Sequence, residues 1–180
     1  MISPKDQDEL IEVSPEQLTS QELVEMEMDE LDDIFTNAEA PAVGDMEGTY
    51  SGLPLAGIAH EYLPPPLKKA FALYAGSPLF LWKGKEFEAT SDENEGKGTN
   101  LLISLNSPLR LFSFTTRIEP SEFDDKDCLV FDYDSSKNPV FIRIIKDELR
   151  RVNSMLYLGR VYVKIRDESK FALYFCLEVA

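Results

Sequence analysis

Few residues of this 180-residue chain have the types and spacing needed for acid–base or nucleophilic chemistry. His60 is the single histidine, so a multi-histidine metal site is excluded and nucleophile–histidine catalysis would have to centre on this residue. It lies among apolar neighbours in AGIAHEYL, which favours a structural or pocket-lining role, with proton transfer as the alternative. The carboxylates of EPSEFDDKD are typical of a solvated loop rather than of a catalytic pair. We therefore predict a protein that is not an enzyme and that uses no metal and no cofactor.

Two arginines are more informative, because each interrupts an apolar, strand-like run: Arg143 in VFIRII and Arg160 in LGRVYV. A guanidinium that points into a barrel is strongly unfavourable unless a carboxylate or an anionic ligand group pairs with it. Each arginine therefore either faces solvent on the outside or points inward. An inward arginine, or Tyr157, would fix the polar end of an otherwise apolar ligand.

Trp82 is the single tryptophan, in FLWKGKEF. The sequence Lys83-Gly84-Lys85 that follows it indicates a bend or bulge, because glycine inside a strand commonly marks one. Core packing against a barrel wall is the first interpretation of the indole, and contact with a ligand is the second. In a barrel that holds a ligand the two roles overlap.

From residue 79 onward the chain consists of short runs rich in aromatic and β-branched residues, separated by polar turns such as DSSKN and RDESK. The runs are LFLWKGKEF, LLISLN, LRLFSFTTRI, CLVFDY, PVFIRII, SMLYLGRVYVKI and FALYFCLEV. Several of them are apolar on both faces, which favours a closed antiparallel barrel over an open sheet with one wet face. We predict a mainly β protein: a lipocalin-like antiparallel barrel with one or two short helices, one of them over 66–75.

Acidic charge is concentrated at the start of the chain. Residues 1–47 hold 15 acidic residues and one basic residue, whereas the rest hold 18 and 17, which leaves the body nearly neutral. We predict an acidic, partly helical tail over 1–45 and a barrel domain over 46–180. Ser14, Pro15 and Gln17 favour the start of an amphipathic helix over 15–35. That helix is expected to dock on a protein partner or on its own barrel, where it could cover the mouth as a lid.

The same composition excludes several classes of function. The acidic segment repels phosphate backbones, and the body has no basic run interleaved with aromatic residues, so no nucleic-acid partner is predicted. Cys128 and Cys176 show no metal-binding spacing and are consistent with a reducing compartment. The chain has no apolar run long enough for a membrane span, and its start lacks the features of a secretion signal. We predict a cytoplasmic protein.

Short motifs resemble a known family. GTYSG, residues 48–52, is similar to the G-x-W-x-G signature that opens a family of lipocalin-like bacterial domains of unassigned function, with Tyr50 in place of the tryptophan. WKGKEF, residues 82–87, is similar to a later element of that family. The order of Asp132, Pro139, Arg143 and Gly159 resembles its companion C-terminal domain. The resemblance covers residues 46–180, implies a pocket for a small apolar molecule, and supplies no catalytic residue.

The predicted function is non-catalytic binding of a small hydrophobic, fatty-acid-like ligand in a barrel cavity. The alternative is a protein-interaction module that uses the acidic helix over 15–35. The candidate ligand-binding residues are Tyr50, His60, Trp82, Phe112, Phe114, Arg143, Tyr157 and Arg160.

Overall fold

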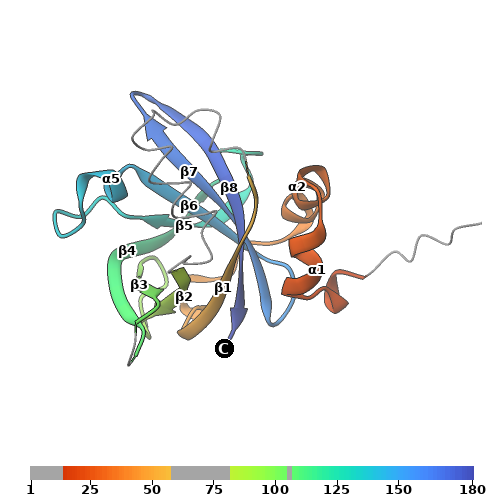
Figure 1. Cartoon of the computed structure of the whole chain (residues 1–180), viewed down its shortest axis with the longest axis horizontal. Helices are drawn as coiled ribbons and strands as arrows, with labels where there is room; N and C mark the ends of the chain where they lie inside the picture. The colour runs from red at the N-terminus through yellow and green to blue at the C-terminus, as the bar shows by residue number, and fades with distance from the viewer. Residues whose placement is uncertain (1–13, 58–81, 105–106) are drawn as a thin grey trace, which may run out of the picture.

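The structure is a computed structural model that describes residues 14–57, 82–104 and 107–180. The described residues form a closed barrel of eight antiparallel strands, in which each strand pairs with the next and β8 returns to β1 (Figure 1). The strands are β1 (Gly48–Gly57), β2 (Trp82–Phe87), β3 (Gly96–Leu102), β4 (Leu109–Pro120), β5 (Asp127–Asp132), β6 (Ile145–Arg151), β7 (Leu156–Ile165) and β8 (Glu168–Val179). The predicted mainly β antiparallel barrel is confirmed. Predictions for His60 and for a helix over 66–75 lie outside the described residues.

A bulge at the start of β2 determines which side chains enter the barrel. The register between β2 and β3 shifts between Trp82 and Gly84, as the glycine in FLWKGKEF predicted. Gly84 has φ 138°, and a Cβ atom there would lie 1.9 Å from the carbonyl oxygen of Tyr50, so another residue would not fit. In a regular strand, residues three apart face opposite sides. Because of the bulge, Trp82 and Lys85 both point inward, with the lysine Nζ 5.6 Å from the indole centroid.

The barrel interior is packed mainly with aromatic side chains. Rings from strands that are not paired with each other meet edge to face across the interior, such as Phe87 with Phe131 and Trp82 with Phe175, with centroids 5.6 and 5.8 Å apart. Such contacts add to the stabilisation that burial of apolar area provides. The buried members of this core are Val43, Met46, Tyr50, Trp82, Phe87, Phe114, Leu129, Phe131, Tyr133, Leu149, Tyr157, Phe175 and Leu177.

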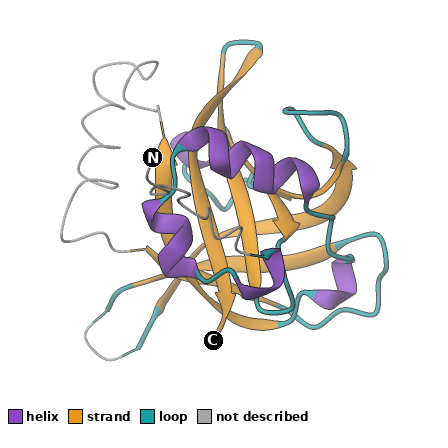
Figure 2. Ribbon diagram, turned by 90° about the vertical axis from the view of Figure 1, so that its right-hand side faces the viewer, coloured by secondary structure: helices purple, strands orange, loops and turns teal. Residues whose placement is uncertain are grey.

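Most of the segment before β1 packs on the outer wall of the barrel. It contains short 3-10 turns (Pro15–Gln17 and Val43–Asp45) and the helices α1 (Ser20–Glu25) and α2 (Met28–Asn37). Figure 2 shows these helices lying across the strands. Their apolar residues, including Leu23, Leu31 and Phe35, pack against the outward-facing side chains of β7 and β8. The helices therefore dock on their own barrel, against its wall rather than as a lid over its mouth.

The single helix predicted over 15–35 is in fact two helices. The side chain of Thr19 accepts a hydrogen bond from the backbone of Glu22, and Glu22 reaches back to the backbone N–H of Thr19, a capping box that starts α1. A second capping box between Glu27 and Glu30 starts α2. The predicted cap at Ser14 is wrong, because its side chain makes no capping hydrogen bond.

A second correction concerns VFIRII, which was predicted as a strand. Residues Val140–Arg143 form a single helical turn, α5, that begins after Pro139. The carbonyl oxygen of Pro139 accepts hydrogen bonds from the backbone N–H groups of Ile142 and Arg143. Strand β6 starts only at Ile145. Among the described residues, no helix is both long enough and apolar enough to cross a membrane.

Candidate functional site

A buried lysine lies at the centre of the barrel. Lys85 is 2% exposed, and its ammonium group donates hydrogen bonds of 2.8 Å to Asp147 Oδ2, 2.5 Å to the Tyr133 hydroxyl and 3.0 Å to Asn100 Oδ1. Since a lysine ammonium has three N–H donors, these contacts fill its capacity. We call Lys85, Asn100, Tyr133 and Asp147 the interior polar cluster.

The other members of the interior polar cluster are bonded to one another. The Tyr133 hydroxyl donates to Asp147 Oδ2 at 2.8 Å and accepts from Asn100 Nδ2 at 3.3 Å. The indole N–H of Trp82 donates to Asn100 Oδ1 at 2.9 Å. A network connected in this way is the condition under which polar groups persist inside a protein. The cluster contains one ammonium and one carboxylate, so its charges balance.

Four different strands or strand ends supply the cluster. The bulge of β2 turns Lys85 inward, and Asn100 lies on the neighbouring β3. Tyr133 directly follows β5, and Asp147 lies on β6, where the alternation of the strand sends Leu149 inward as well. The polar groups therefore meet across the barrel rather than along one strand.

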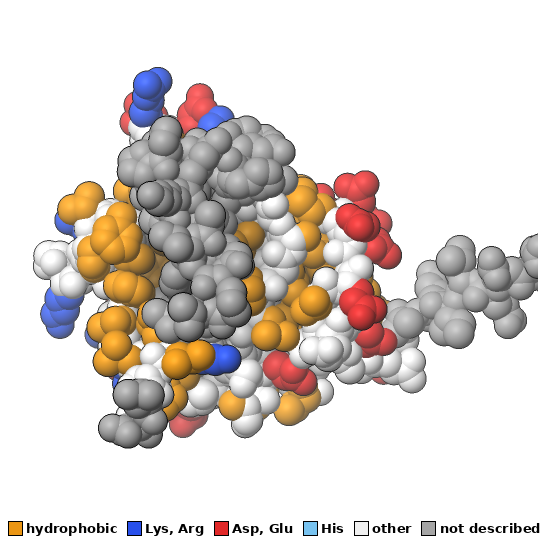
Figure 3. All heavy atoms as spheres, in the orientation of Figure 1, with side chains coloured by type: hydrophobic (Ala, Val, Ile, Leu, Met, Phe, Trp, Pro, Cys, Tyr) orange, Lys and Arg blue, Asp and Glu red, His pale blue; other side chains and the backbone are white. Residues whose placement is uncertain are grey.

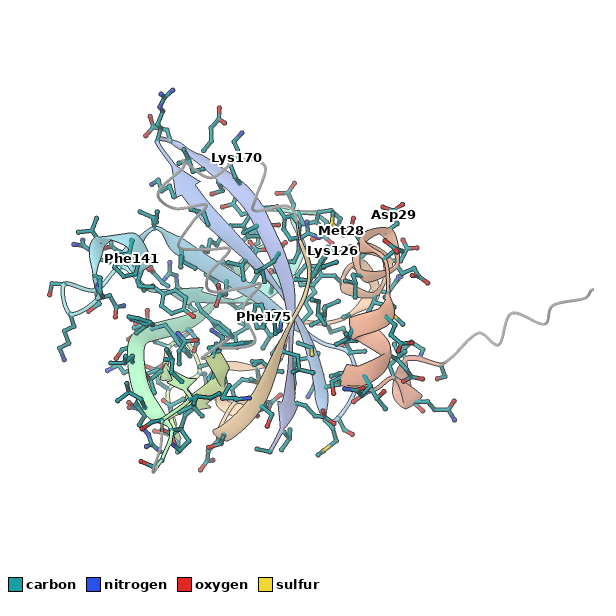
Figure 4. The ribbon with its side chains drawn as sticks, in the orientation of Figure 1. Met28, Asp29, Lys126, Phe141, Lys170 and Phe175 are labelled. Carbon is teal, nitrogen blue, oxygen red and sulfur yellow. The ribbon has the colours of Figure 1, made fainter. Side chains whose placement is uncertain are left out.

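Aromatic rings surround the lysine. The ring centroids of Trp82, Phe114, Phe131, Tyr133 and Phe175 lie 5.0 to 5.6 Å from Lys85 Nζ. Rings at this distance stabilise a cation through their negative faces. Burial nevertheless lowers the pKa of Lys85, and the nearby Asp147 carboxylate opposes this shift only in part. Figure 4 labels Phe175 near the middle of the barrel.

Two of these rings occupy space that is free because the facing residue is glycine. A Cβ atom on Gly52 would lie 2.3 Å from the Trp82 ring, and one on Gly159 would lie 2.2 Å from the Phe175 ring. Both distances are far below van der Waals contact. Around Lys85, the rings of Trp82 and Phe175 therefore pack directly against the backbone of Gly52 and Gly159.

The two ends of the interior differ in burial. At the end where Tyr157 pairs with Leu177 the core is buried, and Val43 and Met46 from the segment before β1 belong to the same buried core. At the other end, apolar residues that pack against the same core are only half-buried. These are Phe112, Ile142, Ile145, Val161 and Leu173. We call this second end of the interior the half-buried end.

Arg160 lies on the outer wall of the barrel, not in its interior. Its Nη1 atom donates a 2.5 Å hydrogen bond to Asp32 on α2, and it also contacts the Tyr174 hydroxyl. Rings of Phe35, Phe123, Tyr162, Phe171 and Tyr174 lie around its guanidinium. The prediction that Arg160 contacts an interior ligand is wrong, because the helices cover the face to which it points. Its role is to fasten α2 to the strands.

Arg143 is not an interior anchor either. It ends α5 on the outside of the barrel, where it is exposed and pairs with Asp134 at 2.7 Å. An inward orientation of Arg143 required residues 140–145 to form a strand. These residues instead begin with a helical turn after Pro139, so Arg143 points to the outside.

Five other predicted site residues belong to the interior. Tyr50, Trp82, Phe114 and Tyr157 are buried in the core, and Phe112 packs against it at the half-buried end. Tyr50 and Tyr157 meet edge to face, with ring centroids 5.6 Å apart. These residues surround the interior polar cluster or continue its walls.

Sequence reasoning missed the whole interior polar cluster. Lys85 was considered only as part of a bend or bulge, and Asn100, Tyr133 and Asp147 were assigned no role. A signal was present in FLWKGKEF. A one-residue bulge between Trp82 and Lys85 predicts that both face the same side, and the tryptophan indicates that this side is buried.

The fold and the interior define a class: a closed antiparallel barrel of eight strands with a buried, charge-balanced polar cluster. The chain is similar to a protein from Thermomonospora curvata of known crystal structure, with TM-score 0.54 and 17% sequence identity over 86% of this chain and 88% of that one. This likeness supports the fold. No protein-family model and no curated protein matches the chain. The resemblance to the G-x-W-x-G family therefore stays a prediction.

Proposed function

We propose that the barrel binds a small, mostly apolar ligand in its interior and does not catalyse its turnover. The ligand's apolar part occupies the half-buried end, and its polar end reaches the interior polar cluster. A chain like that of a fatty acid, as predicted from sequence and implied by the lipocalin-like resemblance, would suit the apolar walls at this end.

One observation carries this proposal: the buried pair of Lys85 and Asp147 in a mainly apolar core. A buried ion pair is a poor source of stability, because apolar side chains of similar volume often stabilise a core more. A pair that adds little to folding is readily explained by a second role. Recognition of the polar end of a ligand is such a role, since apolar pockets use a few convergent polar groups to orient what they bind.

Trp82 provides the test, because it is the single tryptophan and it contacts the cluster directly. We expect its fluorescence emission to change saturably when the purified chain is titrated with nonanol, and native mass spectrometry to show one ligand per chain. Val161→Phe fills the half-buried end and should weaken binding at least about tenfold. Leu173→Phe serves the same purpose if the first variant is unstable.

A matched control is Val24→Phe, because Val24 lies exposed on α1 at the outer wall. It should bind nonanol as the unmodified chain does. The proposal fails if neither nonanol nor other medium-chain compounds change the Trp82 emission. It also fails if Val161→Phe and Val24→Phe bind nonanol with equal affinity.

A second proposal is recognition of a protein partner by α1 and α2, favoured by the acidic surface that these helices turn away from the barrel. Glu25, Asp29 and Asp33 are exposed there, and Figure 3 shows acidic side chains gathered on this side of the molecule. Neutralising the three residues should abolish capture of a basic partner without loss of stability. If the chain with these three residues neutralised captures the basic partner as well as the original chain does, the acidic surface of α1 and α2 is not the binding site.

A further inference from the structure

We propose that Lys85 is the attachment point for the ligand, and that the ligand is a small apolar aldehyde or ketone held as a reversible imine. This inference rests on the proposed function and names the chemical class of its ligand.

Charge balance argues against an ionised ligand. Lys85 and Asp147 neutralise each other at 2.8 Å, and both are buried. A carboxylate brought to this site would add a negative charge without a cation to match it, and an unpaired buried charge is strongly unfavourable. The polar end of the ligand should therefore be uncharged. A fatty acid would be a poorer ligand than an alcohol or aldehyde of the same length.

The surroundings of Lys85 suit an amine nucleophile. Desolvation in an apolar pocket is one way in which proteins favour the neutral, reactive form of a lysine. Here the proton has a recipient, since Asp147 Oδ2 lies 2.8 Å from Nζ. The Tyr133 hydroxyl lies next to both groups and completes a short path for protons. Lys85 therefore has a carboxylate base and a hydroxyl within hydrogen-bonding distance, and apolar rings surround all three groups.

The covalent step balances in atoms and charge. Lys85 gives a proton to Asp147, and the free Nζ electron pair forms a C–N bond while the carbonyl π pair moves to oxygen, which takes that proton. The nitrogen then returns a proton to Asp147, which passes it to the hydroxyl, so that water leaves as the C=N bond forms. The products are a protonated imine, the Asp147 carboxylate and one water, with no oxidation or reduction.

The site suits the product as well as the reactant. A protonated imine carries the same charge as the ammonium it replaces, so Asp147 stays paired and the aromatic rings still surround a cation. Exclusion of water by these rings protects the imine from hydrolysis. The apolar chain of the compound would extend along Val161 and Leu173 toward the half-buried end.

The test traps the imine chemically. The full chain is incubated with nonanal, reduced with cyanoborohydride and mapped by peptide mass spectrometry. We expect one adduct at Lys85, with at least about tenfold more modification there than at the exposed Lys83 of the same strand. Lys83→Arg should keep the adduct and Lys85→Arg should lose it. If Lys85→Arg does not fold, the extents of adduct formation at Lys85 and Lys83 in the chain without substitutions still test the inference. Modification spread evenly over surface lysines, or none at Lys85, would overturn the inference.

Two related compounds separate this inference from the proposed function. Nonanol cannot form an imine, so a chain that binds nonanol but is not modified at Lys85 would retain the proposed function and refute the imine. Failure of both compounds refutes both. Nonanoate should bind at least about tenfold more weakly than nonanol. Equal or tighter binding of nonanoate would refute the charge-balance argument.

Discussion

Two cations of this protein lie in cages of aromatic rings, and they differ in what their partners connect. Arg160 on the outer wall joins β7 to Asp32 of α2, so it links two elements that are far apart in the sequence. Lys85 in the interior bonds to residues of strands that backbone pairing already holds together. The outer cation has a clear role in assembling the fold. The inner one does not, and this contrast is the reason for assigning it to ligand recognition.

The largest effect is expected from breaking the inner pair on one side. Lys85→Met leaves the Asp147 carboxylate buried without a cation, which should lower the free energy of unfolding by about 3–5 kcal/mol. The double variant Lys85→Met/Asp147→Leu should recover to within about 1 kcal/mol of the original chain or exceed it, because apolar replacements remove both charges. Urea unfolding measures both.

Lys83→Met is the matched control, because Lys83 is exposed on the same strand. It should change stability by less than about 0.5 kcal/mol. A double variant as unstable as Lys85→Met alone would show that the inner pair is needed for the fold, and the contrast with Arg160 would be lost.

Breaking the outer pair should have a smaller effect. Arg160→Met leaves Asp32 partly exposed to water, so we expect a loss of about 1–3 kcal/mol from the hydrogen bonds and ring contacts of the guanidinium. Limited proteolysis should become faster within α2. Arg143→Met, at an exposed pair, is the control and should leave both measurements unchanged. Unaltered proteolysis of α2 in Arg160→Met would contradict a fastening role.

Alkaline pH should lower the free energy of unfolding through three buried tyrosines, two beside Arg160 and one in the interior. Burial raises the pKa of the Tyr162 and Tyr174 hydroxyls, and burial raises the pKa of Tyr50 in the interior to about 12. Because these values are higher in the folded than in the unfolded chain, their stabilisation is complete below the usual tyrosine pKa of about 10 and is lost as pH rises beyond it. Urea unfolding at pH values on both sides of 10 should show this decline. A free energy of unfolding that stays constant there would contradict it.

The smallest effect compares two acids of one helix. Asp29 is exposed on α2, away from the barrel (Figure 4), so Asp29→Asn should change stability by less than about 0.5 kcal/mol. Asp32→Asn removes the negative charge that pairs with Arg160 and should cost about 1–2 kcal/mol. Equal effects in thermal unfolding would mean that the Asp32 contact adds nothing.

The closed antiparallel barrel could be predicted from the sequence, but the explanation given for strands that are apolar on both faces was incomplete. The two apolar faces of β8 were attributed to closure of the barrel. In the structure the outward face, with Tyr174 and Cys176, is apolar because α1 and α2 cover it. Arg160 and Leu158 lie on the same, outward face of β7. Strand alternation alone could not distinguish the interior from a covered exterior, since both are apolar. That choice depends on tertiary packing.

The interior polar cluster could not be predicted from strand alternation for a different reason. A single bulge reverses the orientation of every residue beyond it, and its position between Trp82 and Gly84 depends on the pairing with β3. Asn100, Tyr133 and Asp147 come from separate strands, and each is unremarkable in its own segment. Their meeting is a property of the closed barrel.

The most direct test of the account is the dissociation constant of nonanol for Lys85→Met/Asp147→Leu, measured through Trp82 emission. If the inner pair serves recognition, the free energy of unfolding of this variant lies within about 1 kcal/mol of that of the original chain or exceeds it, and yet the variant binds nonanol at least about tenfold more weakly. If the variant is equally stable and binds nonanol with unchanged affinity, the inner pair does not recognise the ligand and the central claim is wrong.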